Sequence, residues 1–324
     1  MTTDQGLVVA YVLDGQGGGR TVGWDEVRAW KPGDALLWVH LDYSQESARQ
    51  WMRDESGIDD IIAESLLLSD VRPRSLPTRD GLMVILRGVN LNPGQHPDDM
   101  VSLRMWVERD RIITLRRRHL LSIDDLRERI DRGVGPVSSG SFLVDVSDRL
   151  VERMSNVIHE VEDTIDRLDE QIATGESRGM RHEIADVRRE AILLRRYLAP
   201  QRDAMSRLHN EPVEWLDEVQ RMRLREIADR TMRYVEDLDS ARDRAGVGQE
   251  ELATRMAEQM NNRMYVLSVV AALFLPLGFV TGLLGVNVAG IPGTEDPGAF
   301  IAVCLMMVLL ALVQVWFFRR RGWL

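Results

Sequence analysis

Two long apolar stretches near the end of the chain dominate its hydropathy pattern. No charged side chain occurs between Arg263 and Glu295, and none occurs between Asp296 and Arg319. A bilayer-spanning helix needs about 20 mostly apolar residues, and neither stretch has the polar face of a helix at the surface of a soluble domain. The pattern predicts a membrane protein with transmembrane helices at 264–286 and 299–318. A loop at 287–298 joins them, and a tail at 319–324 follows.

Basic residues near the two predicted spans set their expected orientation. Arg255 and Arg263 precede the first span and 319–321 are all arginine, whereas the loop at 287–298 has no Lys or Arg. Loops rich in Lys and Arg stay in the cytoplasm, so we expect both termini to be cytoplasmic and the short loop external. The first residues lack a basic segment followed by an apolar run, so we expect no signal peptide.

Residues 1–140 alternate short β-type runs with amphipathic helical segments. The strands are predicted at 8–13, 36–41, 82–89, 101–108 and 111–116. The helices are predicted at 46–55, 59–68 and 123–132. This pattern indicates a cytosolic α/β domain with mixed or partly antiparallel strands, and Glu108-Arg109-Asp110 is typical of a hairpin turn.

Residues 141–263 show only helical periodicity and predict a cytosolic helical stalk. One apolar stripe recurs at steps of three and four and comprises Leu143, Val146, Leu150, Met154, Val157, Val161, Ile165, Leu168 and Ile172. Gly175 and Gly179 should end that helix. A second stripe comprises Ile184, Val187, Ala191, Leu194 and Leu198. A third helix is expected after Pro212 and would run to residue 284, with Gly246 and Gly248 as its weak points.

The polar faces of these helices are dense in Arg, Asp and Glu. One interpretation is a solvated surface with ion pairs between neighbouring turns of one helix. The other is an acidic bundle that concentrates cations near a pore.

Composition narrows the possible functions. The chain is 44% hydrophobic and 28% charged, which fits a packed core and excludes a disordered chain. Its formal net charge of −10 makes nucleic acid an unfavourable partner. Cys304 is the only cysteine, and the six histidines do not have the spacing of a zinc site. The chain has no local nucleophile or nucleotide-binding motif, so we expect neither an enzyme nor a bound cofactor.

The first predicted span ends in an unusual way. Gly278 and Gly282 have the small-xxx-small spacing that lets helix backbones approach closely, although such a pair also occurs in ordinary helix packing. Pro276 lies within the span, where the carbonyl it frees needs another partner. Gly285 should end the helix, so that Asn287 offers a carbonyl oxygen to a hydrated cation at the outer boundary.

These residues resemble the CorA-type, two-span metal ion transporters, which carry a Gly-Met-Asn motif at the end of the first span. The motif here is Gly285-Val286-Asn287, followed by 289–293, AGIPG. Valine in place of methionine is typical of the zinc-transporting branch of this family. The segments at 72–74, 140–145, 195–203 and 323–324 also resemble that branch, and the likeness covers essentially the whole chain. It implies a CorA-like funnel and a homopentamer with a pore lined by the first span of each copy.

The resemblance also implies roles for individual residues. By register from Asn287, the family's pore-lining positions fall on Gly282, Gly278, Leu275, Leu267 and Met264. The family often has threonine where this chain has Gly278, so a polar ring is lost. The inner acidic gate of the magnesium channels falls at Glu250, next to Glu251.

The predicted pore offers an amide, backbone carbonyls, apolar side chains and the thioether of Met264. Because no His or Cys lines it, we expect an ion that stays mostly hydrated and weakly held. In the external loop, Glu295 and Asp296 of several copies would form a carboxylate ring that attracts divalent cations; the alternative is a merely soluble loop.

The leading hypothesis is a Zn²⁺ transporter of the inner membrane that takes zinc up and is stimulated by, or coupled to, a proton gradient. This coupling is implied by the resemblance, since neither span has a charged group for a proton relay. One alternative is a magnesium or cobalt channel of the same family. The other is a membrane-anchored coiled-coil scaffold without transport, which would not need the Gly-x-Asn motif.

Overall fold

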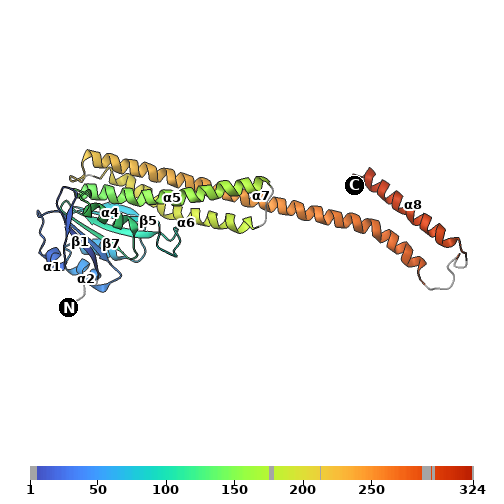
Figure 1. The fold of residues 1–324 in the computed structure, drawn as a ribbon, viewed down its shortest axis with the longest axis horizontal. Coiled ribbons are helices and arrows are strands. Elements are labelled where there is room, and N and C mark those ends of the chain that lie inside the picture. The colour runs from blue at the N-terminus through green and yellow to red at the C-terminus, as the bar shows by residue number, and fades with distance from the viewer. Residues whose placement is uncertain (1–5, 175–178, 212, 287–292, 294–295, 323–324) are drawn as a thin grey trace. The chain divides into compact units, whose positions relative to one another are not determined.

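The chain folds into two compact units, Met1–Gln249 and Glu250–Leu324. The computed structural model describes residues 6–174, 179–211, 213–286, 293 and 296–322 (Figure 1). The first unit is a mixed sheet with helices on both of its faces. The second unit contains the end of one very long helix and the final helix.

The first unit is built on one seven-stranded sheet with the order β2-β1-β3-β7-β6-β5-β4. Its strands are β1 (Leu7–Leu13), β2 (Gly19–Thr21), β3 (Leu37–Asp42), β4 (Arg74–Pro77), β5 (Leu82–Gly88), β6 (Val101–Val107) and β7 (Arg111–Arg116). The pair β3 and β7 is parallel and the other neighbours are antiparallel. The predicted mixed α/β domain is therefore confirmed. So is the hairpin at 108–110, where the Glu108 N–H donates to the Arg111 carbonyl at 2.8 Å.

The sequence patterns missed three short elements. Strand β2 is three residues long and has no apolar run. Strand β4 is an edge strand with a single buried residue, Ser75, and ends at Pro77, a residue that sheets tolerate at their edges. Helix α1 (Trp24–Ala29) buries only Val27. Elements this short or this exposed carry too few apolar positions to produce a period.

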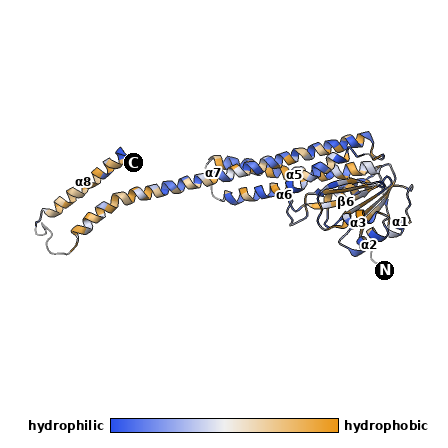
Figure 2. Ribbon diagram, turned by 180° about the vertical axis from the view of Figure 1, so that it is seen from behind, coloured by the Kyte–Doolittle hydropathy of each residue, from blue (hydrophilic) through white to orange (hydrophobic). Residues whose placement is uncertain are grey.

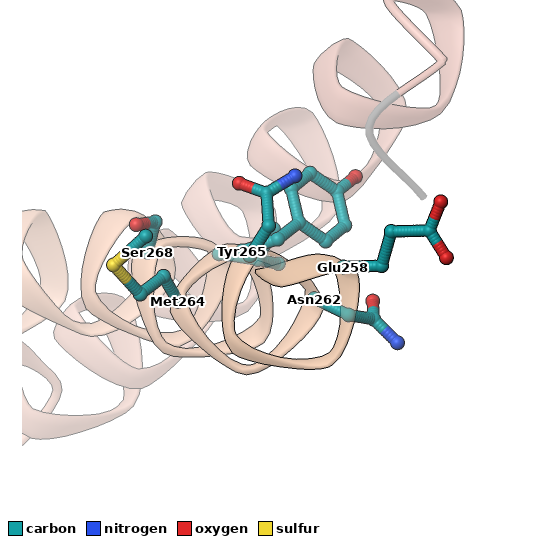
Figure 3. A pocket seen from close by; sticks show the side chains of 7 residues that line it. Glu258, Asn262, Met264, Tyr265 and Ser268 are labelled. Carbon is teal, nitrogen blue, oxygen red and sulfur yellow. The ribbon is translucent and has the colours of Figure 1, made fainter. Parts of the chain in front are cut away.

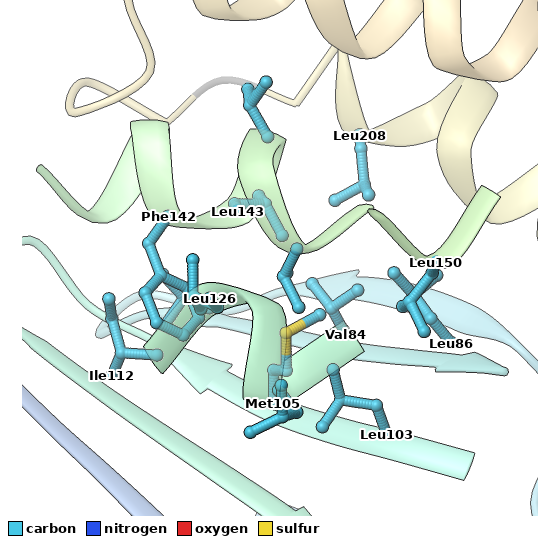
Figure 4. Close-up of a cluster of buried hydrophobic side chains, with 14 of the residues drawn as sticks. Val84, Leu86, Leu103, Met105, Ile112, Leu126, Phe142, Leu143, Leu150 and Leu208 are labelled. Atoms are coloured by element: carbon cyan, nitrogen blue, oxygen red, sulfur yellow. The ribbon is translucent and has the colours of Figure 1, made fainter. Parts of the chain in front are cut away.

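The sheet is buried on both faces, so its central strands are continuous apolar runs. Their side chains point alternately to one face and to the other. On β5, Leu82, Val84 and Leu86 belong to one core cluster, whereas Met83 belongs to the other. The second cluster is closed by α1, α2 (Glu46–Asp54) and α3 (Asp60–Leu67). The first is closed by α4 (Leu121–Asp131), α5 (Ser139–Thr174), α6 (Met180–Leu208) and the start of α7 (Glu218–Leu284) (Figure 4).

The long helices share their core with the sheet. All the residues of both predicted stripes are buried on α5 and α6, which confirms the period of three and four. Phe142 and Leu150 of α5 pack in one cluster with Val84 of β5. The structure therefore joins the α/β part and most of the long helices in one unit that ends at residue 249. The sequence pattern instead predicts a boundary at residue 140.

The ends of the long helices differ slightly from the sequence expectation. Gly179 precedes α6 with a φ of 83°, a left-handed conformation that glycine adopts readily; Gly175 lies outside the described residues. Helix α7 begins at Glu218 rather than directly after Pro212, and it continues through Gly246, Gly248 and Pro276 to Leu284.

Ion pairs join α7 to its neighbouring helices within the first unit. Arg244 of α7 pairs with Asp166 and Asp169 of α5 at 2.6 and 2.7 Å. Arg230 of α7 also pairs with Asp148 of α5 at 2.6 Å. The charged faces are therefore partly used between helices. Other pairs join neighbouring turns of one helix, as the sequence interpretation expected: Arg149 pairs with Glu152 on α5, and Arg255 with Glu251 on α7.

Candidate functional site

Among the described residues, two helices are long and apolar enough to cross a membrane, judged by length and composition, and their apolar parts lie in the second unit. They are the last part of α7 and α8 (Ala299–Arg320), both strongly apolar (Figure 2). Leu267 and Leu275 of α7 are each 70% exposed. Leaving one leucine in water rather than burying it forgoes about 1.5–3 kcal/mol. Such a surface needs lipid or other protein chains around it.

The predicted pore-lining residues lie on one face of α7. At about 100° per residue, the directions of Met264, Leu267, Leu275, Gly278 and Gly282 fall within an arc of about 80°. All five are exposed in the single chain. The helix geometry therefore allows them to line a common surface along the whole apolar segment.

The less exposed residues of the same segment lie on other sides of the helix. Val269 is buried, and Ala272, Leu273, Leu277 and Val280 are half-buried. At about 100° per residue, their directions are centred opposite Met264. The predicted pore-lining face is thus the side of α7 that its own chain leaves most open.

The two glycines of this face meet open space within the described chain. A Cβ atom built on Gly278 or on Gly282 would have no described heavy atom within 4 Å, apart from the helix's own nearby backbone. Their small size is therefore not needed for packing inside one chain. Close helix packing through them, which the spacing predicts, would have to involve another copy.

The first span ends close to the predicted position. Helix α7 ends at Leu284, and the Gly285 N–H donates to the Thr281 carbonyl at 3.0 Å. The Thr281 hydroxyl donates to the carbonyls of Leu277 and Gly278 at 3.1 Å. Asn287, the residue predicted to select the ion, lies outside the described residues.

Of the two predicted carboxylates in the connecting loop, the structure describes one. The Asp296 Oδ1 accepts a hydrogen bond from the Gly298 N–H at 2.8 Å, directly before α8. This carboxylate therefore has a local structural contact at the start of a helix, where negative charge is favourable. Glu295 lies outside the described residues, and a carboxylate ring remains a prediction.

The structure separates the two residues of the predicted inner acidic gate. Arg255 donates to the Glu251 Oε1 at 2.6 Å, one helical turn away. Glu250 is exposed and lies about 40° from the direction of Met264, whereas Glu251 lies about 140° away. If either residue faces the ion path, it is Glu250.

A hollow of about 560 Å³ beside Met264 contains polar residues that the sequence reasoning missed. Its wall includes Asn261, Tyr265 and Ser268, and Glu258 lies at one end (Figure 3). Asn261 and Ser268 are three and four residues from Met264, so they flank the predicted face. Asn261 precedes the predicted span and Ser268 lies inside it, so a search for polar residues three or four positions from Met264 would have found both.

Two further observations concern metal-binding side chains. Across the described residues, no three His, Cys, Asp or Glu side chains are grouped in a way that could hold a metal ion. Cys304 is a free, exposed thiol on α8.

Comparison with known proteins identifies relatives over almost the full length. The family of CorA-like Mg²⁺ transporter proteins matches residues 33–320. The divalent cation transporter CmaX of Pseudomonas aeruginosa is 39% identical over 325 residues, which cover 99% of this chain and 98% of CmaX. The zinc transport protein ZntB of Yersinia enterocolitica is 37% identical over 317 residues, which cover 98% of this chain and 96% of ZntB.

Solved structures show the same fold. The structure of full-length CmaX matches with a TM-score of 0.86 and 38% identity, covering 99% of both chains. The CorA magnesium transporter of Methanocaldococcus jannaschii matches with a TM-score of 0.80 over 100% of both chains, at 18% identity. The second of these likenesses concerns the fold alone.

Proposed function

Because this chain belongs to the family of CorA-like Mg²⁺ transporter proteins, we propose that it carries a divalent cation across a membrane. The observation that carries this proposal is the open face of α7, on which Met264, Leu267, Leu275, Gly278 and Gly282 share one direction. In this proposal, that face of each copy lines a central ion path.

The proposed ion is Zn²⁺. Relatives named as zinc transport proteins are 37% identical over nearly the full chain, and the chain has valine at 286, as in the zinc branch. The described face offers apolar groups, small residues and one thioether, so a hydrated, weakly held ion is the species that suits it. Mg²⁺ or Co²⁺ is the second candidate, because the matching family is named for Mg²⁺.

The proposed assembly is a homopentamer. Two spans enclose no path of their own, and an ion must be shielded from lipid, so several copies must surround an axis. A cyclic arrangement repeats one interface around the ring. The glycines at 278 and 282, which meet open space in one chain, supply a surface for such contacts. Light scattering corrected for detergent should give the mass of five 36.9 kDa chains.

The proposed location is the inner membrane, with both termini in the cytoplasm. Arg319 and Arg320 end α8, Arg321 follows it, and Arg263 precedes the apolar part of α7. Basic residues at these ends favour the cytoplasmic side. The proposed direction is uptake, stimulated by a proton gradient.

The test is ion flux into liposomes that contain the purified full-length protein and an enclosed zinc-sensitive dye. We expect Zn²⁺ entry that increases when the liposomes are given an inwardly directed proton gradient. Mg²⁺ and Co²⁺ are added as competitors in separate experiments. No entry of any divalent ion would contradict transport and favour a scaffold. Entry of Mg²⁺ without Zn²⁺ would favour the magnesium alternative.

A further inference from the structure

A row of three arginines crosses one end of the sheet on the face covered by α2 and α3. Arg87 lies on β5, Arg104 on β6, and Arg117 directly follows β7. Arg104 is paired with Ile85 and with Leu115 in the sheet register. Because strand side chains alternate between faces, Arg87 and Arg104 share one face, and continuing the alternation places Arg117 there as well.

Arg104 is the unusual member of this row, because its charge is buried. Only 1% of Arg104 is exposed. Its guanidinium donates to the carbonyls of Leu66 at 2.5 Å and Ser69 at 3.5 Å, and it lies 4.2 Å from the centre of the Tyr43 ring. Its Nε has no partner. A buried cation without an anion is unfavourable, and burial lowers the pKa of Arg104 from its ordinary value.

A hollow of about 400 Å³ lies beside two residues that Arg104 contacts, although Arg104 itself is not part of its wall. Its wall includes Tyr43 and Ser69, both of which Arg104 contacts, together with Arg49, Arg53 and Arg117. Glu64 also lines it, so three arginines, one carboxylate and two hydroxyl-bearing residues surround a space large enough for a small anion and its water.

The positive charge around the hollow exceeds the negative charge. Arg53 pairs with Glu64 at 2.6 Å and Arg49 with Glu46 at 3.6 Å. The ion pairs among the described residues include none to Arg104 or to Arg117. Two cations thus lack a carboxylate in a chain whose formal net charge is −10.

We propose that this hollow binds a tetrahedral dianion, either inorganic phosphate or the phosphate group of a small phosphomonoester. Its two negative charges match the net charge of the wall, in which three arginines outnumber one glutamate by two. Guanidinium groups bind phosphate through parallel hydrogen bonds, and the Ser69 hydroxyl supplies a further donor. Arg104 already donates to the carbonyls of Leu66, in the last turn of α3, and of Ser69, just after it, which offsets part of the repulsion that a helix C-terminus exerts on an anion. A divalent cation is disfavoured by the same charges.

The experiment uses calorimetric titration of the full-length protein in detergent at constant ionic strength and about pH 7.5. Inorganic phosphate should bind saturably, with one site per chain. Arg117→Gln should weaken this binding by at least about tenfold, because it removes a charge-assisted contact. Arg118→Gln is the matched control: Arg118 is the next residue, is half-exposed and already pairs with Asp99. Its affinity should stay within about twofold of the unmodified protein.

Two results would overturn the proposal. One is no saturable binding at phosphate concentrations up to about 10 mM. The other is an equal loss of affinity in both variants, which would indicate general attraction rather than a site. A parallel titration with glycerol 3-phosphate distinguishes the sources: tighter binding than inorganic phosphate assigns a phosphomonoester, and weaker binding assigns free phosphate. Zinc flux is not part of this readout, so the proposal stands or falls separately from transport.

Discussion

The guanidinium of Arg87 on β5 lies 4.0 Å from the centre of the Tyr197 ring on α6. The same arginine donates to the carbonyls of Met100 and Val71 at 2.8 and 2.9 Å, and its backbone N–H donates to the Gln201 Oε1 at 2.6 Å. These contacts give a physical role to the segment 195–203, which resembles the zinc branch of the family. It fastens α6 to the sheet.

The first prediction concerns this attachment. Gln201→Leu should destabilise the protein by about 1–3 kcal/mol, because the buried N–H of Arg87 would lose its acceptor. Chemical unfolding in detergent, followed by circular dichroism, measures the change. Gln171→Leu is the control, since the contact of the Gln171 side chain with Arg167 on the same helix is a long one, at 3.5 Å. Equal stability of the two variants would show that the Gln201 contact is dispensable.

The second prediction concerns the apolar part of the proposed ion path. Leu267→Asn should raise the leak of divalent ions several-fold, since an apolar constriction can exclude water and ions when closed. Leu273→Asn places the same amide in the same span but about 120° from Leu267 around α7 and opposite Met264, and its leak should stay near that of the unmodified protein. Dye-loaded liposomes measure both. A greater leak from the control would mean that the predicted face is wrong.

The third prediction concerns Asn287, which follows the end of the first span. Asn287→Ala should lower Zn²⁺ entry by at least about tenfold, because the amide is the polar group offered to the arriving ion. Light scattering must show that the variant keeps its oligomeric mass. Unchanged flux from a correctly assembled variant would exclude Asn287 as the selecting residue.

The fourth prediction uses a half-buried carboxyl in the first unit. The pKa of Glu190 lies above its ordinary value of 4.5, first because burial disfavours the charged form, and then because Asp98 and Glu160 repel it. A raised pKa means that the folded state holds the proton more tightly than the unfolded state. Stability is therefore lost as the pH rises from 4.5 through the folded-state pKa.

Glu190→Gln removes this loss, so it should raise the unfolding temperature at about pH 7 and have little effect at about pH 4, where Glu190 is mostly protonated in both states. Glu170→Gln, an exposed change on α5, serves as the control. A variant whose unfolding temperature changes equally at both pH values would refute the assigned cause.

Features that depend on the residues of a single helix could be predicted from the sequence. The stripe from Leu143 to Ile172 repeats within one helix, and all of its positions are buried as expected. The proposed pore-lining face is predictable for the same reason, since helix geometry alone fixes the directions of Met264 and Leu275. The family resemblance supplied the register.

Features formed by several elements that are distant in the sequence could not be predicted from it. Tyr43, Ser69 and Arg117 meet around one hollow only because the sheet and α3 fold against each other. No local spacing links them, and Arg104 in isolation would be read as an exposed residue of a strand. The β2 and β4 strands were missed for a related reason, since their pairing with neighbours defines them more than their own residues do.

The exposed thiol on α8 gives each copy one chemical handle. Because Cys304 is the only cysteine of the chain, a spin label attached there needs no engineered background, and every measured distance joins equivalent points on different copies. In a cyclic ring these distances are the side and the diagonals of a regular polygon. Their ratio is about 1.6 for five copies and about 1.4 for four. The native side chain can therefore report the number of copies in the proposed ring while the protein remains in a lipid bilayer.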